Sequence, residues 1–168
     1  MLLTTVDEWQ FVELSLADHA GEVLEFFERN RNFFVTVEGR TPGVELVKET
    51  FTSVPGGVQL HQKQIVGVYR DQRLVSFIEL IKDRHRVNDW LLSLFIVDIE
   101  VRGLGFGRRV IDALEAHLSS LGVACLILGV VEGNKPAMAF WERMNYLPAD
   151  IHEGAEGKRI HSFYKELC

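Results

Sequence analysis

The alternation of apolar and polar positions predicts a strand followed by two helices in the N-terminal third of the chain. Residues 10–16 alternate polar and apolar, which is typical of a half-buried strand. Asp18 can cap a helix that runs to about residue 28 and carries apolar side chains on one face. A second, shorter helix is expected over 44–51, between two turns that contain proline and glycine.

Three apolar segments in the middle of the chain indicate a meander of strands. Segments 64–70, 74–82 and 90–97 are separated by a two-residue turn and by a charged loop. The third segment is nearly all apolar, so we expect it to be buried on both faces of a sheet.

Beyond this meander the pattern changes to helices alternating with strands. A glycine-rich turn at 103–107 opens an amphipathic helix that runs to about residue 121, and a buried strand is expected over 124–131. Together with the strand at 90–97, this helix and strand predict a right-handed parallel crossover.

The last third of the chain predicts one more helix and two closing strands. Asn134 can cap the helix, and the strands are expected over 146–149 and 159–167. The whole order, β-α-α-β-β-β-α-β-α-β-β, predicts a single α/β domain over residues 1–168, with a mixed sheet and helices on its faces.

Composition and charge narrow the classes of function. With 168 residues, 47% of them apolar, the chain is long enough to bury one core. A net charge of −6 argues against a nucleic-acid partner. The longest apolar run is too short to span a membrane, and residues 1–8 do not resemble a signal peptide. Cys125 and Cys168 form no disulfide framework, and the histidines lack metal-ligand spacing, so we expect a cytoplasmic protein without a metal or a membrane partner.

The glycine-rich turn is the segment that indicates chemistry. Gly103, Gly105 and Gly107 stand between a buried strand and a helix, where glycines let main-chain N–H groups approach a ligand. The helix start adds unpaired N–H donors and partial positive charge, and Arg102 and Arg108 add full charges. This combination predicts a site for a diphosphate. A turn without any ligand is the plainer interpretation of the same glycines.

Two familiar phosphate-binding motifs do not fit this turn. The P-loop requires a lysine followed by serine or threonine, and the chain contains no such pair. The dinucleotide fingerprint requires a third glycine where Arg108 or Val110 stands.

The chain resembles the GCN5-related N-acetyltransferases, the GNAT family. Their central motif, [QR]-x-x-G-x-[GA] at a helix start, is matched at every defined position by Arg102-Gly103-Leu104-Gly105-Phe106-Gly107. Val97 stands where the family's strand ends, and the N-x-x-A-x-x-[FY] motif is matched by Asn134, Ala137 and Phe140. The resemblance covers about residues 60–167.

This resemblance implies a fold, a cosubstrate and a set of binding residues. The fold would have a central, mostly antiparallel sheet with one splayed parallel pair and helices on both faces. Acetyl-CoA would be the acyl donor, with its pantetheine arm pairing with the main chain in the splay. For Asn134 a plain helix cap, and for Phe140 core packing, are alternative interpretations. The implied coenzyme residues are Phe95, Val97, Arg102, Gly103, Leu104, Gly105, Phe106, Gly107, Arg108, Asn134, Phe140 and Trp141.

The family's catalytic residues cannot be transferred to this chain. Trp141 stands where relatives usually carry a tyrosine acid, and an indole N–H has no usable acidity. Gly129 and Ser93 stand where some members carry a base. Glu79, an acid within an apolar strand, is a candidate base whose plain alternative is an outward-facing edge residue, and Tyr146 is a candidate acid.

Other acidic and phenolic residues give additional candidates. Asp89 and Tyr164 are further candidates for acid or base, whereas Asp98 is expected to point away from the coenzyme because its neighbour Val97 faces it.

The resulting hypothesis is an N-acetyltransferase that acts by direct attack on a primary amine of a small molecule or a peptide. A non-catalytic acyl-CoA sensor is the alternative, and a module for another phosphate ligand is a third. The acceptor would lie near residues 25–60 and 150–160, which carry no signature, and Phe33-Phe34 are candidates for its lining. Similar proteins often form homodimers, so a homodimer is a further expectation.

Overall fold

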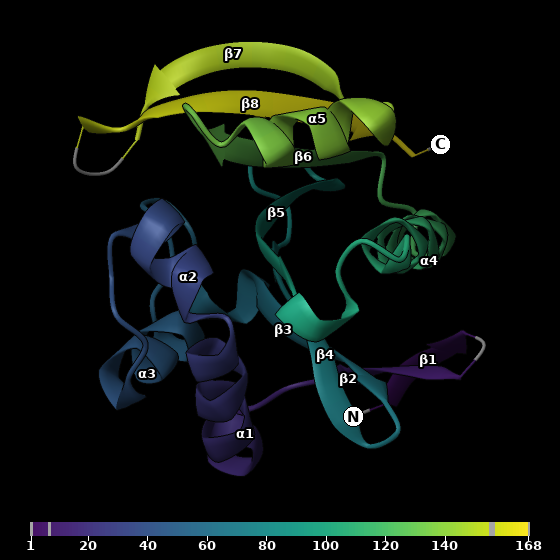
Figure 1. Cartoon of the computed structure of the whole chain (residues 1–168). Coiled ribbons are helices and arrows are strands. Elements are labelled where there is room, and N and C mark those ends of the chain that lie inside the picture. The colour runs from purple at the N-terminus through teal and green to yellow at the C-terminus, as the bar shows by residue number, and fades with distance from the viewer. Residues whose placement is uncertain (1, 7, 155–156, 168) are drawn as a thin grey trace.

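The computed structural model describes residues 2–6, 8–154 and 157–167, and its strands form one eight-stranded sheet (Figure 1). The strand order is β1-β2-β3-β4-β5-β6-β8-β7. The pair β5–β6 is parallel and the six other neighbouring pairs are antiparallel, which confirms the predicted fold class. The strands are β1 (Leu2–Val6), β2 (Trp9–Glu13), β3 (Lys63–Arg70), β4 (Arg73–Ile81), β5 (Asp89–Val97), β6 (Cys125–Val131), β7 (Leu147–Glu153) and β8 (Arg159–Glu166).

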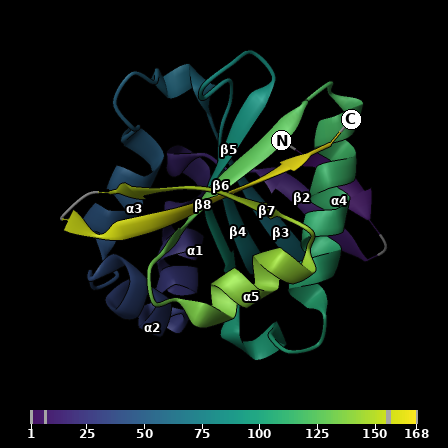
Figure 2. The same ribbon diagram turned by 90° about the horizontal axis from the view of Figure 1, so that it is seen from above.

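Helices cover both faces of this sheet, and a separate apolar core lies under each face. In Figure 2, α4 lies on one side of the sheet and α1 to α3 lie on the other. The core under α4 and α5 is built from residues such as Val110, Ile111 and Leu128, and the opposite core contains Phe27 and Phe77. The helical elements are α1 (Leu16–Arg29), α2 (Arg31–Phe33), the π-helical η1 (Phe34–Glu38), α3 (Val44–Thr52), the 3₁₀ turns η2 (Leu60–Gln62) and η3 (Ile99–Val101), α4 (Phe106–Ser120) and α5 (Lys135–Arg143).

The N-terminal part of the chain differs most from the prediction. Strand β1 and the segment α2–η1 were not predicted from the pattern. Ser15, rather than Asp18, caps α1, because the Ser15 hydroxyl accepts the Asp18 N–H at 3.2 Å. At the other end β7 runs to Glu153 instead of residue 149; all of its residues are exposed, so it leaves no alternation of burial in the sequence.

Strand β2, which lies near the β1 edge of the sheet, packs against the start of helix α4. The ring of Trp9 is fully buried and lies 4.5 Å from the ring of Phe106, the first residue of α4. The guanidinium of Arg109 lies 4.2 Å above the same indole, which is the geometry of a cation–π contact. The N-terminal hairpin is therefore packed directly against the first turn of α4.

Strands β5 and β6 diverge halfway along their length. Their ladder runs from Asp89–Cys125 to Leu92–Leu128 and stops there, although both strands continue. At the same level Glu79 pairs with Leu94 and Leu80 pairs with Leu92, so Ser93 is the extra residue of a β-bulge. Ser93 is exposed, which corrects the expectation that this strand is buried on both faces.

The divergence leaves main-chain groups of β5 facing a gap. Asp98 donates its N–H to Val75 of β4 at 2.9 Å, and hydrogen-bonding direction alternates along a strand. The N–H and C=O groups of Phe95 and Val97 consequently point away from β4, toward the side where β6 has separated. A ligand with an extended, amide-bearing arm can pair there as an added strand.

Candidate active site

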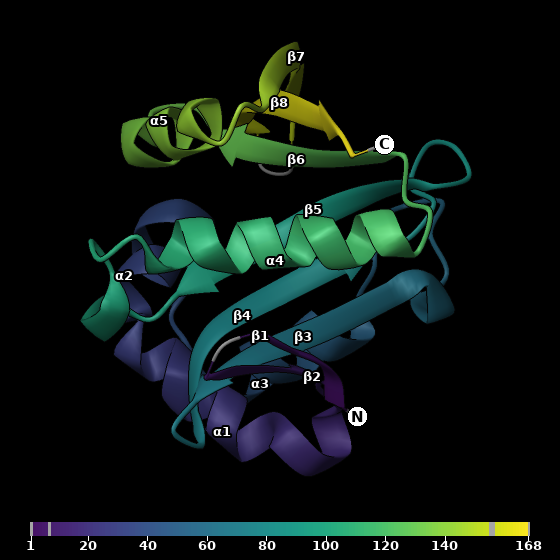
Figure 3. The same cartoon turned by 90° about the vertical axis from the view of Figure 1, so that its right-hand side faces the viewer.

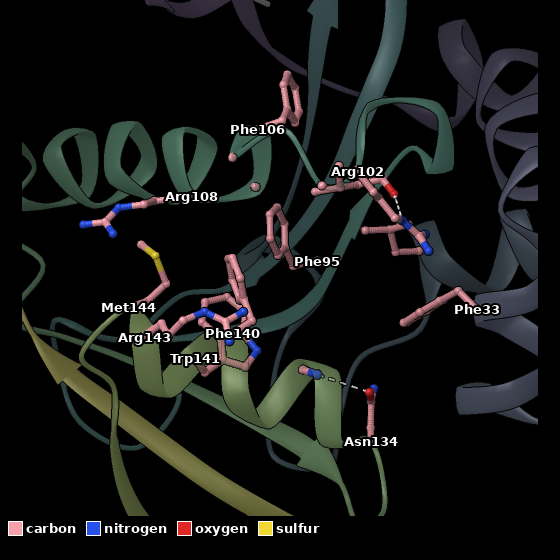
Figure 4. A pocket seen from close by; sticks show the side chains of 16 residues that line it. Phe33, Phe95, Arg102, Phe106, Arg108, Asn134, Phe140, Trp141, Arg143 and Met144 are labelled. Carbon is pink, nitrogen blue, oxygen red and sulfur yellow. Dashed lines mark hydrogen bonds between the residues drawn. The ribbon is translucent and has the colours of Figure 1, made fainter.

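A cavity of about 560 Å³ lies where β5 and β6 separate (Figure 4). Its walls are the end of β5, the turn that opens α4, and helix α5, while Phe33 of α2 closes one side. Figure 3 shows α4 running alongside β5, with α5 next to β6. Eleven of the twelve residues predicted for the coenzyme line this cavity; the side chain of Leu104 is 79% exposed and does not. Lining residues that sequence reasoning did not place at the coenzyme are Phe33, Ile96, Ala137, Arg143 and Met144.

The glycine turn leaves the start of α4 bare. Gly103 and Gly105 have φ angles of 80° and 73°, in the left-handed region that favours glycine. A Cβ built at either position would have no atom within 4 Å, so neighbouring protein atoms do not fill this space. At Gly107 a Cβ would lie 3.5 Å from Val97 and 3.6 Å from Phe140, in ordinary contact. The first N–H groups of α4 have no intrahelical partner, and a helix start of this kind can bind an anion at the cavity wall.

The charged groups in the cavity wall are all cationic. The ionisable side chains among its described lining residues are Arg102, Arg108 and Arg143. Arg108 forms an exposed ion pair with Asp112 at 3.7 Å, a contact that contributes little in water. Arg143 comes from the last turn of α5, and no signal in the sequence distinguished it from a solvent-facing helix residue. The arrangement suits a ligand with several negative charges.

Aromatic side chains form the inner wall. The ring of Phe95 lies 6.2 Å from Phe140 and 5.8 Å from Trp141, and the latter two rings are 4.9 Å apart. Trp141 is 6% exposed. Its indole can donate a hydrogen bond, but it cannot transfer a proton to a leaving group.

Asn134 occupies the N-cap of α5, as predicted. Its side-chain oxygen accepts the Ala137 N–H at 3.3 Å. The cap uses only the oxygen of the amide, so the capping role is compatible with a second role for the side-chain NH₂ group at the cavity. Pro136 in the first turn of the helix is consistent with a helix start.

Comparison with known proteins assigns the chain to a family. The model of the acetyltransferase (GNAT) family matches residues 36–146, which include the glycine turn and α5. The chain belongs to the GNAT acetyltransferase family. A search among curated proteins found no significant match.

Solved GNAT-like structures share the fold over nearly the whole chain. An acetyltransferase from Thermus thermophilus has a TM-score of 0.76 at 18% identity, covering 99% of each chain. An acetyltransferase from Salmonella typhimurium, described as modifying the N-terminal serine of a ribosomal protein, has a TM-score of 0.78 at 11% identity and covers 99% of each chain. Spermidine N-acetyltransferase from Vibrio cholerae, solved with CoA and spermine, has a TM-score of 0.71 at 15% identity, covering 95% of this chain and 96% of that chain.

Glu79, the candidate base of this GNAT protein, lies away from the cavity. It is 8% exposed, and its carboxylate pairs with the Lys63 ammonium at 3.1 Å; Lys63 also donates to the Ser53 carbonyl at 2.6 Å. Glu79 is therefore neither an outward-facing edge residue nor among the residues that line the cavity. Its partner Lys63 follows a 3₁₀ turn at the start of β3, and no motif in the sequence linked the two positions.

Tyr146, the candidate acid, is also placed elsewhere. Its hydroxyl donates to Glu115 of α4 at 2.8 Å, its ring packs 5.0 Å from Trp141, and it is not among the residues that line the cavity. Burial and the neighbouring Glu115 carboxylate raise the pKa of Tyr146, which makes it a weaker acid. Neither its position nor its raised pKa supports the prediction of Tyr146 as proton donor.

The other candidates do not reach the cavity either. Asp98 is fully buried and bonded to the Arg29 guanidinium at 3.0 Å, so it points away from the coenzyme side as expected. Asp89, Tyr164 and the family-position residue Ser93 are not among the lining residues. Within the described residues there is no cluster of histidine, cysteine and acidic groups able to hold a metal ion, and no helix long and apolar enough to cross a membrane.

Proposed function

We propose that this GNAT protein is an N-acetyltransferase that transfers the acetyl group of acetyl-CoA to a primary amine of a small molecule or a peptide. The observation that carries the proposal is the cavity itself: a bare helix start with flanking arginines opens onto a gap between parted strands. This combination fits a ligand with a diphosphate at one end and an extended amide chain at the other.

Each part of the cavity matches one part of coenzyme A. The main-chain N–H groups from Gly103 to Arg108 would hold the diphosphate, with Arg108 and Arg143 compensating its charge. The outward N–H and C=O groups of Phe95 and the N–H of Val97 would pair with the pantetheine arm, and the NH₂ group of Asn134 would donate to it. When bound, the coenzyme supplies a thioester whose acyl group is activated toward amines.

The lining residues can orient the reactants but offer no side chain for acid–base work. The described ionisable groups in the wall are arginines, which stay protonated. The acceptor amine must therefore arrive neutral or lose its proton to water, and catalysis rests on proximity and on main-chain donors that polarise the thioester carbonyl. The aromatic wall of Phe95, Phe140 and Trp141 would shield the reacting atoms from water.

One alternative has an observation in its favour. Trp141 replaces the usual acid, and the cavity offers no substitute among its described lining residues, which is what a non-catalytic acyl-CoA sensor would need. The two functions predict the same binding of the coenzyme and differ in turnover.

Binding and turnover can be measured separately with the purified protein. Of the three tryptophans, Trp141 lines the cavity, so CoA should change the intrinsic fluorescence, and a Trp141→Phe variant should lose that signal. Acetyl-CoA is then mixed with a panel of polyamines, amino acids and peptides with free N-termini, and thiol release is followed. Release with at least one amine supports the proposal, and tight binding without release across the panel supports the sensor. Protection by ATP or NAD without any binding of CoA would overturn both.

A further inference from the structure

The C-terminal end of α1 is joined to the segment that precedes the glycine turn by one buried amide. Asn30 stands at the junction of α1 and α2 and is 2% exposed. Its side-chain oxygen accepts the main-chain N–H of Ile99 at 3.0 Å and Nη2 of Arg102 at 3.1 Å. Its side-chain nitrogen donates to the carbonyl of Phe26 at 2.9 Å. The amide is thus used on both sides, once within its own helix and twice across to the turn segment.

Arg102 completes the link from α1 to the end of β5. Its Nε donates to the carbonyl of Val97 at 2.7 Å, while Nη2 is bonded to Asn30. The guanidinium therefore bridges the last residue of β5 and the last turn of α1, and Figure 4 shows it at the cavity rim on the side of Phe33. A side chain that uses its donors in this way is held in one position instead of reaching freely toward a ligand.

A second contact fixes the same segment from the same helix. The Asp98 carboxylate is fully buried; it accepts from Arg29 Nε at 3.0 Å and from the Glu100 main-chain N–H at 3.1 Å. Residues 98, 99 and 102 are consequently each bonded to the end of α1. Gly103 follows immediately, with its positive φ.

A glycine turn needs such support if its main chain is to bind an anion. Gly103 and Gly105 have no side chain with which to hold their own conformation, and glycine has more conformations to lose than any other residue. Ordering the turn only when the ligand arrives would weaken affinity, whereas a turn ordered in advance avoids that cost. The residues that order it stand before the turn, in the segment that α1 holds.

We propose that Asn30 is a positioning residue for coenzyme binding, which acts through Arg102 to hold the 103–107 turn with its N–H groups facing the diphosphate. This inference rests on the proposed function. It assigns Arg102 the role of a clasp between β5 and α1, in place of the direct phosphate contact expected from its charge. Helix α2 begins at the next residue and carries Phe33 to the cavity, so Asn30 stands directly before this part of the wall.

A double-mutant cycle on the affinity for free CoA tests the proposal. Asn30→Ala and Arg102→Ala should each raise the Kd about tenfold. The Kd of the double variant should exceed that of Arg102→Ala by no more than about twofold, because both substitutions remove the same bond between Asn30 and Arg102. Arg84→Gln is the matched control. Arg84 donates to the Gly56 carbonyl at 3.2 Å and is not among the residues that line the cavity, so the Kd of this variant should stay at the wild-type value.

The outcomes separate this inference from the proposed function. A wild-type protein that does not bind CoA overturns the proposed function. Wild-type binding with an unchanged Kd in Asn30→Ala, or additive effects of the two substitutions, overturns the positioning role. Thermal melts show whether Asn30→Ala still folds. If it does not, the exposed Arg102 provides a second test. The clasp uses two nitrogens of the planar guanidinium, a geometry that lysine lacks, so Arg102→Lys should bind CoA as poorly as Arg102→Ala. Recovery of wild-type affinity by the lysine would instead indicate a simple charge contact with phosphate.

Discussion

The two faces of the sheet treat charge in opposite ways. On the face covered by α1 and α3, the buried carboxylates of Glu79 and Asp98 each have a cationic partner, Lys63 and Arg29. On the face covered by α4 and α5, the cavity wall presents arginines and main-chain N–H groups, and none of its described lining residues is acidic. The buried carboxylates of the first face are neutralised within the protein, whereas the cavity in the second face gathers arginines without an acidic residue among its described lining. Proximity of an ionisable group to the strand β5 therefore does not by itself indicate catalysis.

Removing one member of the buried pair should have the largest effect on stability. Lys63→Met leaves the Glu79 carboxylate buried without its partner, and we expect a loss of about 3–5 kcal/mol in the free energy of unfolding. The double variant Lys63→Met/Glu79→Leu should recover most of this loss. Urea denaturation measures both values. If CoA affinity changed tenfold in the folded double variant, the separation of the two faces would be wrong.

A β-branched side chain in the glycine turn should abolish anion binding at the start of α4. In Gly105→Val the left-handed φ is strongly disfavoured, and the side chain enters the space above the helix start. We expect CoA affinity to fall about 100-fold, equivalent to about 2.7 kcal/mol. Gly56→Ala is the matched control, because Gly56 lacks a positive φ and a Cβ there meets no atom. Calorimetry checks both, and equal affinities would contradict an anion site at this turn.

Neutralising the exposed arginines should weaken binding moderately. Arg108→Gln and Arg143→Gln are each expected to raise the Kd for CoA about fivefold, and the effect should shrink at high salt because exposed charges are screened. Arg86→Gln, on the exposed loop before β5, removes the same charge away from the cavity and should leave the Kd unchanged. A loss that persists in about 1 M salt would argue against a charge contact.

The smallest effect is expected at Tyr146. The raised pKa of Tyr146 keeps its hydroxyl protonated throughout the assay range, so Tyr146→Phe should leave the pH profile of the acetyl transfer unchanged and reduce stability by about 1 kcal/mol through loss of the bond to Glu115. In both proteins the rate should rise with pH until the acceptor amine is neutral, without a falling limb from an enzyme acid. A falling limb that disappears in Tyr146→Phe would restore it as the proton donor.

The difference between the two faces also explains what the sequence could predict. The turn at 103–107, the Asn134 cap and the apolar stripe of α4 follow from local rules for glycines, caps and helical periodicity, and the structure shows them where they were expected. The contacts of Glu79 and Tyr146 could not be predicted, because their partners Lys63 and Glu115 lie on other elements and depend on strand register and helix rotation. Asn30 was missed for the same reason, since its two bonds to the turn segment span about 70 residues of sequence.

The packing of Trp9 against Phe106 and Arg109 has a practical consequence for work on this protein. The family match begins at residue 36, and the hairpin before it could be taken for a dispensable leader. The indole of Trp9 nevertheless packs against the first turn of α4, so deleting the strand that carries it would remove the support of Phe106, which lines the cavity. Apparent inactivity of such a preparation would say little about the natural chain.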